Sequence, residues 1–348
     1  MPGVTIAPEG VYVFWKLSSD SHVVGLRWSP DRRYLVAGGI EGDVGIVDVP
    51  TGAFVHRWKA HAFGLSSVAL SPTGDRIATC GQDGALRIWR ASDAGLVAEC
   101  RLANRWGIRA EYSPSGHLIG VAAGKTVAFY DSDGSLVREF TASDYTVSDL
   151  GWKPPARGCN AETLATSGYG GVHLWRADLD ARANRFEWKG SSLVLAWSPD
   201  GRYLATGDQD STVHFWIVAK GKDLEMSGYP IKVKELAWSA DSRFLATGGG
   251  DVVTVWDCAG RGPRGTRPLA LEGHEAKLTA MEFSRGGVLA SGSEDGEVRL
   301  WRPHADETVR AALSAQSAIG VLAWSSDDAL LAIGAANGDV LCVAADLA

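Results

Sequence analysis

Residue types that can do chemistry are scattered along this chain. The five cysteines form no C-x-x-C pair, and the eight histidines show no metal-ligand spacing. Two glycine-rich stretches, 168–171 and 248–250, open no helix, so we interpret them as turns between strands and not as phosphate-binding loops. We therefore expect no cofactor and no metal site, and we interpret Cys80 and Cys342 as small buried hydrophobic residues.

The charge of the chain argues against several kinds of partner. Its 348 residues carry 34 Lys and Arg against 41 Asp and Glu, a net charge of −7, so we expect no nucleic-acid and no membrane partner. No apolar run approaches the roughly 20 residues of a membrane span, and the N-terminus lacks a signal-peptide pattern. With an odd number of dispersed cysteines and no N-glycosylation sequon, the chain is predicted to be cytoplasmic.

One sequence motif, a short strand that ends in an aromatic or apolar residue before a turn, recurs eight times. The turns begin at positions 29, 71, 113, 153, 198, 239, 284 and 325. Within each copy, further short alternating strands follow, separated by turns such as the Ser-Pro-Asp-Gly of 198–201. A single unit of this kind cannot bury both of its faces. The motif recurs every 40–45 residues, and this period therefore predicts an all-β, closed propeller of four-stranded antiparallel blades.

The copies resemble the WD-repeat (WD40) family. Gly273-His274, the Leu-Ala-Ser-Gly-Ser-Glu-Asp-Gly of 289–296 and the Val-Arg-Leu-Trp of 298–301 match the pattern of that family, and the resemblance spans about residues 10–345. We expect one propeller domain over residues 1–348 with eight blades, or alternatively seven if one copy is not a blade. Since the last copy lacks a fourth strand, a strand at about residues 11–18 is expected to complete the last blade.

The resemblance also implies a structural tetrad of His, Ser or Thr, Asp and Trp within a blade. Two copies hold the whole set, and these residues are His61, Thr79, Asp83 and Trp89, and His274, Ser291, Asp295 and Trp301. A His, an Asp and a hydroxyl could also form a hydrolase triad. We interpret the sets as structural, because a buried indole needs an acceptor and because other copies keep only part of the set.

The loops of a rigid propeller are expected to carry its binding residues. Aromatic and basic side chains, which often anchor interfaces, cluster near the loops before the first strands of the third to sixth copies. These candidates are Arg105, Trp106, Arg109, Tyr145, Tyr229 and Lys232. Of the 14 tryptophans, only Trp106 has no place in the repeat. Long connections on the opposite face, within 154–162, 177–184 and 259–268, are second candidates.

These patterns predict a monomeric, non-catalytic scaffold that binds a protein or peptide. The alternative is a propeller hydrolase or lyase with an active site at the mouth of the central channel. That site would need several carboxylates or histidines at the position before each first-strand aromatic. Of the eight such positions, only Glu111 and Glu282 are acidic.

Overall fold

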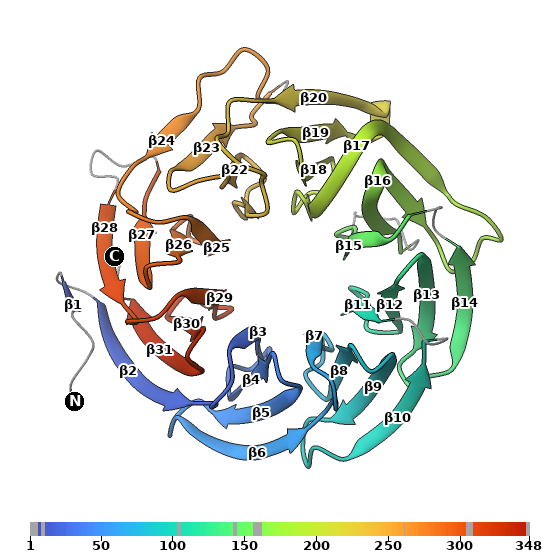
Figure 1. Cartoon of the computed structure of the whole chain (residues 1–348), viewed down its shortest axis with the longest axis vertical. Coiled ribbons are helices and arrows are strands. Elements are labelled where there is room, and N and C mark those ends of the chain that lie inside the picture. The colour runs from blue at the N-terminus through green and yellow to red at the C-terminus, as the bar shows by residue number, and fades with distance from the viewer. Residues whose placement is uncertain are drawn as a thin grey trace.

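The computed structural model describes residues 6–7, 11–102, 106–141, 145–155, 162–260, 262–303 and 309–345. In these residues, antiparallel sheets follow one another around a ring, with their first strands innermost and their last strands outermost (Figure 1). The one helix described is a single 3-10 turn, η1 (Val218–Lys220).

The first three copies each form a separate four-stranded sheet. Their strands are β3 (Val23–Trp28), β4 (Tyr34–Gly39), β5 (Asp43–Asp48) and β6 (Ala53–Lys59); β7 (Leu65–Leu70), β8 (Arg76–Gly81), β9 (Ala85–Arg90) and β10 (Leu96–Arg101); and β11 (Gly107–Tyr112), β12 (Leu118–Ala123), β13 (Thr126–Asp131) and β14 (Leu136–Thr141).

The fourth and fifth copies join into one six-stranded sheet. Its strands are β15 (Val147–Trp152), β16 (Leu164–Trp175), β17 (Asn184–Trp197), β18 (Tyr203–Asp208), β19 (Val213–Ile217) and β20 (Lys222–Met226). β16 includes the second and third strand segments of the fourth copy. β17 pairs with β16 near its start and with β18 over Ser192–Trp197, so it ends one copy and begins the next.

The last three copies complete the ring. Their strands are β21 (Leu236–Trp238), β22 (Phe244–Thr247), β23 (Val253–Asp257) and β24 (Leu269–Leu271); β25 (Leu278–Phe283), β26 (Leu289–Ser293), β27 (Glu297–Trp301) and β28 (Val309–Ser314); and β29 (Ile319–Trp324), β30 (Leu330–Ala335) and β31 (Asp339–Ala345). β2 (Val11–Ser18) pairs with β31 and supplies the fourth strand of the last copy (Figure 1). The short β1 (Ile6–Ala7) pairs with β28, an addition that the sequence did not predict.

The described residues therefore form seven continuous sheets, the number that we gave as the alternative. The expectation of eight blades is therefore wrong, because β17 runs without a break from the fourth copy into the fifth and joins them in one sheet. All eight sequence copies still contribute strand segments to the ring, and two of them share one sheet.

Burial explains why the copies must stack. Second strands such as β8 and β18 are almost wholly buried, whereas fourth strands such as β6 and β14 alternate between exposed and half-buried residues. The hydrophobic clusters lie between neighbouring copies, for example where Cys80 and Leu86 of the second copy pack with Ile119 and Val121 of the third. Cys80 and Cys342 are fully buried, which confirms their interpretation as core residues.

Candidate functional site

The first-strand tryptophans hydrogen-bond neighbouring copies to each other. Each of the five indole N–H groups donates to a backbone carbonyl on the first strand of the preceding copy, over 2.8–3.3 Å. The pairs are Trp28–Ala323, Trp152–Glu111, Trp197–Gly151, Trp238–Ala196 and Trp324–Glu282. The Trp28–Ala323 bond joins the first copy to the last. These tryptophans therefore link five of the eight pairs of neighbouring copies.

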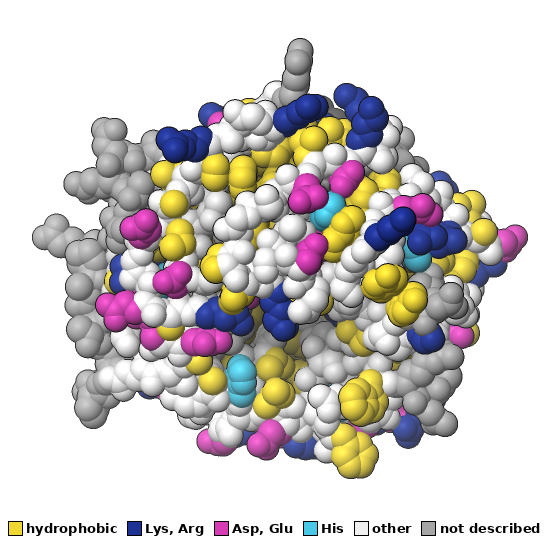
Figure 2. Space-filling model, turned by 45° about the horizontal axis from the view of Figure 1, so that its top comes forward, with side chains coloured by type: hydrophobic (Ala, Val, Ile, Leu, Met, Phe, Trp, Pro, Cys, Tyr) yellow, Lys and Arg dark blue, Asp and Glu magenta, His cyan; other side chains and the backbone are white. Residues whose placement is uncertain are grey.

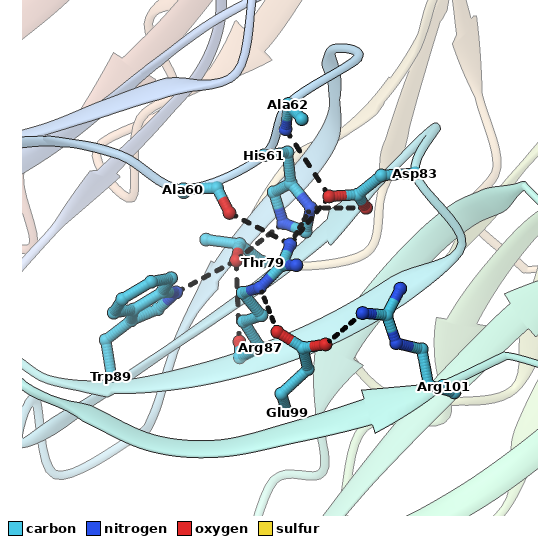
Figure 3. A network of polar contacts seen from close by, with 9 residues as sticks. All are labelled: Ala60, His61, Ala62, Thr79, Asp83, Arg87, Trp89, Glu99 and Arg101. Atoms are coloured by element: carbon cyan, nitrogen blue, oxygen red, sulfur yellow. Dashed lines mark hydrogen bonds and ion pairs between the residues drawn. The ribbon is translucent and has the colours of Figure 1, made fainter.

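The second copy forms a complete polar tetrad (Figure 3). The Trp89 indole donates to Thr79 Oγ1 over 2.9 Å, and Thr79 Oγ1 lies 2.9 Å from His61 Nε2. His61 Nδ1 lies 2.8 Å from Asp83, which also accepts from Arg87 over 2.7 Å. Burial alone would raise the pKa of Asp83, but the bonds from Arg87 and His61 lower it to about 2. Both nitrogens of His61 are thus used within the sheet.

The tetrad of the seventh copy includes one additional residue. Trp301 donates to Ser291 over 2.7 Å, and His274 Nε2 lies 2.7 Å from the same hydroxyl. His274 Nδ1 lies 3.0 Å from Ser293, which in turn donates to Asp295. Ser293 therefore stands between the His and the Asp, a link that the family pattern did not predict. Burial lowers the pKa of His274 to about 4.

Ligand atoms of His274, Asp295 and Glu297 lie within 4.8 Å of one another, close enough to suggest a metal site. Their existing bonds argue against that use. Both His274 nitrogens contact serine hydroxyls, and Glu297 accepts from Arg299 over 2.7 and 2.9 Å. Metal binding would have to break these bonds.

In the sixth copy, Tyr229 replaces the missing histidine. Its hydroxyl lies 2.8 Å from Thr247 Oγ1 and accepts the Trp256 indole N–H over 3.0 Å. We predicted Tyr229 as an interface residue, but the structure places its hydroxyl inside the sheet. The sequence could have indicated this role, because the sixth copy keeps Thr247 and Trp256 of the tetrad but has no histidine to bond them.

The fifth copy keeps Thr206 and Trp216 but leaves their polar groups apart. The buried Trp216 Nε1 and His214 Nε2 have no hydrogen-bond partner among the described residues, and neither has Oδ1 of the fully buried Asp208. Burial raises the pKa of Asp208 to about 8. This copy therefore carries an electrostatic cost that the complete tetrads avoid.

Arg109 lies inside the ring and is not an exposed loop residue. Its Nη1 lies 2.6 Å from Oδ1 of the buried Asp149, and Asp149 Oδ2 accepts the backbone N–H of Leu195 over 3.0 Å. Asp149 raises the pKa of the Arg109 guanidinium. Together, Arg109 and Asp149 link the first strands of three successive copies. The sequence did not single out Asp149, because this contact joins residues from different sheets.

The two channel carboxylates of the enzyme hypothesis, Glu111 and Glu282, line one pocket of about 540 Å³ with Arg27. Burial raises the pKa of Glu282 to about 7, although a bond from the Trp324 backbone and the charge of Arg27 act in the opposite direction. The described residues that line the pocket include no histidine.

Strand direction defines two faces of the propeller. Because the strands alternate in direction, the loops into the first strands and the turns between second and third strands lie on one face, which we call the entry face. Backbone bonds between loop and turn, such as Leu65 N–H to Ile40 O at 3.0 Å, show this proximity. The turns between first and second strands lie on the opposite face.

Four exposed aromatic side chains lie on the entry face, and we call them the aromatic ridge. They are Phe63 (75% exposed), Trp106 (71%), Tyr145 (52%) and Tyr169 (47%). Phe63, Trp106 and Tyr145 come from three successive loops. The ring centroids of Tyr145 and Tyr169 lie 4.5 Å apart. Trp106 and Tyr145 were predicted, whereas Phe63 and Tyr169 were missed.

The other described large apolar side chains that are exposed follow a simple pattern. Ile40 and Ile231 also lie on the entry face, and the rest lie on outer fourth strands; these are Tyr12, Phe14, Val55, Leu96, Leu136, Val137 and Leu269. Of the remaining candidates, Lys232 is half-buried before β21, and Arg105 lies outside the described residues. The insertion at 154–162 lies mostly outside them as well.

This ring of antiparallel sheets, with its repeated indole and hydroxyl bonds, defines a β-propeller. The model of the "WD domain, G-beta repeat" family matches residues 52–90, 188–216, 225–257 and 265–302. The model of the "Anaphase-promoting complex subunit 4 WD40 domain" matches residues 9–69. The chain belongs to the WD40-repeat β-propeller family.

Curated relatives share parts of their length with this chain. The transcriptional corepressor LEUNIG_HOMOLOG of Arabidopsis thaliana is 24% identical over 82% of this chain and 36% of its own length. Cell division cycle 20.1, cofactor of APC complex, from the same plant is 30% identical over 60% of this chain and 46% of its own length. A probable cytosolic iron-sulfur protein assembly protein 1 of Mycosarcoma maydis is 36% identical over 32% of this chain and 22% of its own length. The chain thus spans less than half of each relative.

Among solved structures, the computationally designed Ika8 protein has the same fold. It superposes with a TM-score of 0.80 at 20% sequence identity, covering 94% of this chain and 97% of its own. Within the described residues, no helix has the length and apolar character that crossing a membrane requires.

Proposed function

We propose that this protein is a scaffold that binds a protein or peptide partner on its entry face, with the aromatic ridge as the anchor. One observation carries the proposal, namely that Phe63, Trp106 and Tyr145 are exposed on successive loops of that face. Large aromatic side chains that are exposed at a surface are typical anchors of protein interfaces. The relatives, which are named as a corepressor, a cofactor of a complex and an assembly protein, support the same class of function.

The protein acts without catalysing a reaction. His61 and His274 are only 1% and 5% exposed, and the hydroxyls of Thr79 and Ser291 that they contact are fully buried. Each of these hydroxyls also accepts an indole N–H, so neither set presents a nucleophile and a base to a substrate. At the channel, Glu111 and Glu282 share their pocket with Arg27. These contacts support a structural role for the groups that the enzyme hypothesis would use.

The partner is a protein, not a nucleic acid or a membrane, and the propeller binds it as a monomer in the cytoplasm. Lys and Arg side chains lie among Asp and Glu side chains over the face seen in Figure 2, and the net charge is −7. Such a surface does not attract a polyanion. The described cysteines are unpaired, which supports a reducing compartment.

Site-specific photo-crosslinking tests the proposal. A photoreactive phenylalanine analogue at position 106 is expected to crosslink a protein in extracts of the source cells. The same analogue at Arg33, an exposed residue of the opposite face, is the matched control. Equal crosslinking at both positions, or crosslinking only from position 33, would overturn the assignment of the entry face.

A further inference from the structure

A groove of about 530 Å³ opens between the third and fourth copies beside the aromatic ridge. Residues of β14, of β16 and of the connection from β16 into β17 line it. Two members of the ridge, Tyr145 and Tyr169, belong to this lining. A groove of this volume has room for a small ligand or for a side chain with part of its backbone.

The rest of the aromatic lining is Phe140 and Trp175, whose ring centroids lie 5.1 Å apart. The indole N–H of Trp175 already donates to Thr166 Oγ1 over 2.8 Å. Trp175 is only 2% exposed and packs against Phe140, so the rings that a ligand can contact in the groove are those of Phe140, Tyr145 and Tyr169. An aromatic side chain of a partner would pack against such rings in an offset or edge-on arrangement.

A tight turn fixes the position of Tyr169. Gly170 and Gly171 have φ values of +92° and +105°. A Cβ at Gly171 would lie 2.1 Å from the backbone oxygen of Phe186, so this position requires glycine. The glycine-rich stretch that we interpreted as a turn thus holds one wall of the groove.

Two arginines give the groove a positive charge. Arg182 Nη1 lies 3.3 Å from His173 Nε2, and Arg185 lies 3.3 Å from the exposed Glu187. Glu187 does not line the groove, and the described lining residues include no Asp or Glu. Arginine binds carboxylates through paired, charge-assisted hydrogen bonds.

We infer that this groove binds an acidic peptide segment of the partner. An aromatic side chain of the segment packs against Phe140, Tyr145 and Tyr169, and its carboxylates lie beside Arg182 and Arg185. The inference rests on the proposed function, since the groove begins at Tyr145 and Tyr169 of the aromatic ridge and extends from there to Arg182, in the connection at 177–184. The net charge of −7 disfavours a long polyanion, whereas a short acidic segment meets mainly the local charge of the two arginines.

Fluorescence polarisation with labelled peptides tests this inference. The probe is the pentapeptide Glu-Glu-Phe-Glu-Glu, compared with Glu-Glu-Ala-Glu-Glu, with Lys-Lys-Phe-Lys-Lys and with a short oligothymidylate. We expect saturable binding of the first peptide, and binding that is at least about tenfold weaker for each of the other three.

Variants locate the binding. Arg182→Ala/Arg185→Ala and, separately, Tyr145→Ala/Tyr169→Ala are each expected to weaken binding about tenfold. The control Arg33→Ala/Arg285→Ala removes the same charge from exposed arginines outside the groove and is expected to leave binding unchanged. Thermal transitions would show that all variants are folded.

The inference is overturned if the acidic aromatic peptide does not bind, if the oligothymidylate binds equally well, or if the control variant loses as much affinity as the groove variants. If the peptide does not bind but position 106 still crosslinks a protein, the groove is not the peptide site, and the proposed function stands.

Discussion

The tetrad residues show that one packing problem has several solutions in this chain. The third-strand tryptophan donates to Thr79 in the second copy and to Ser291 in the seventh, each bonded to a histidine, and to Tyr229 in the sixth. In the fifth copy, the indole N–H of the buried Trp216 has no hydrogen-bond acceptor among the described residues. A buried indole without an acceptor is costly, so these copies should differ in their contributions to stability.

Replacing Tyr229 by phenylalanine tests whether its hydroxyl takes the place of the tetrad histidine in the sixth copy. Tyr229→Phe leaves the Trp256 N–H without its acceptor, so we expect a loss of about 1–3 kcal/mol in the free energy of unfolding. Tyr12→Phe, which alters an exposed tyrosine on β2, is the control and should stay within about 0.5 kcal/mol of the parent. Denaturant unfolding measures both. Equal stabilities would contradict the tetrad role of Tyr229.

The buried carboxyl of Asp208 is expected to make the folded protein less stable as the pH rises. Burial raises its pKa from 3.8 to about 8, so the folded protein favours the protonated carboxyl. Stability is then lost as the pH rises from about 4 towards 8, because the unfolded chain ionises more easily. Asp208→Asn keeps the shape without the charge. Its advantage in Tm over the parent should be larger at about pH 8 than at about pH 5, and a constant difference would contradict the assigned burial cost.

At the scale of elements, β2 decides whether the ring is closed. It pairs with β31 over seven residue pairs, and the Trp15 indole donates to Val49 O in the first copy over 2.7 Å. Without β2, β31 would be an exposed edge strand. The contacts of β1 are much smaller, with two residue pairs to β28.

Truncation separates these two elements. Removing residues 1–18 should lower Tm by more than about 5 °C and promote association through the free edge of β31. Removing only residues 1–10 keeps β2 and should have a much smaller effect. Thermal unfolding and light scattering check both variants. Similar transitions for the two truncations would show that β2 does not close the ring.

The repeats predicted most strands because each copy repeats the same alternation and the same turn residues. Spacing could not predict that β17 joins two copies, since that depends on whether strand pairing continues past Gly190. The tetrad of the second copy follows from residue type, but the Ser293 link depends on side-chain geometry. Arg109 was placed on the face because its contact with Asp149 lies between sheets and leaves no local pattern.

At the scale of the whole molecule, stability and binding are carried by different surfaces. Five first-strand indoles form hydrogen bonds between neighbouring copies inside the ring, and they belong to Trp28, Trp152, Trp197, Trp238 and Trp324. Trp106, by contrast, is 71% exposed. A rigid ring can therefore present the loops of its entry face without depending on them for folding. Changes to the aromatic ridge should affect binding and leave Tm nearly unchanged.

The most direct test is the dissociation constant of the partner crosslinked from position 106, measured for the parent and for Trp106→Ala. We expect Kd to rise about tenfold or more, as for an interface anchor, while Tm stays within about 1 °C. Phe14→Ala, which removes an exposed aromatic from the outer strand β2, should leave Kd within about twofold of the parent. An unchanged Kd for Trp106→Ala would contradict the central claim.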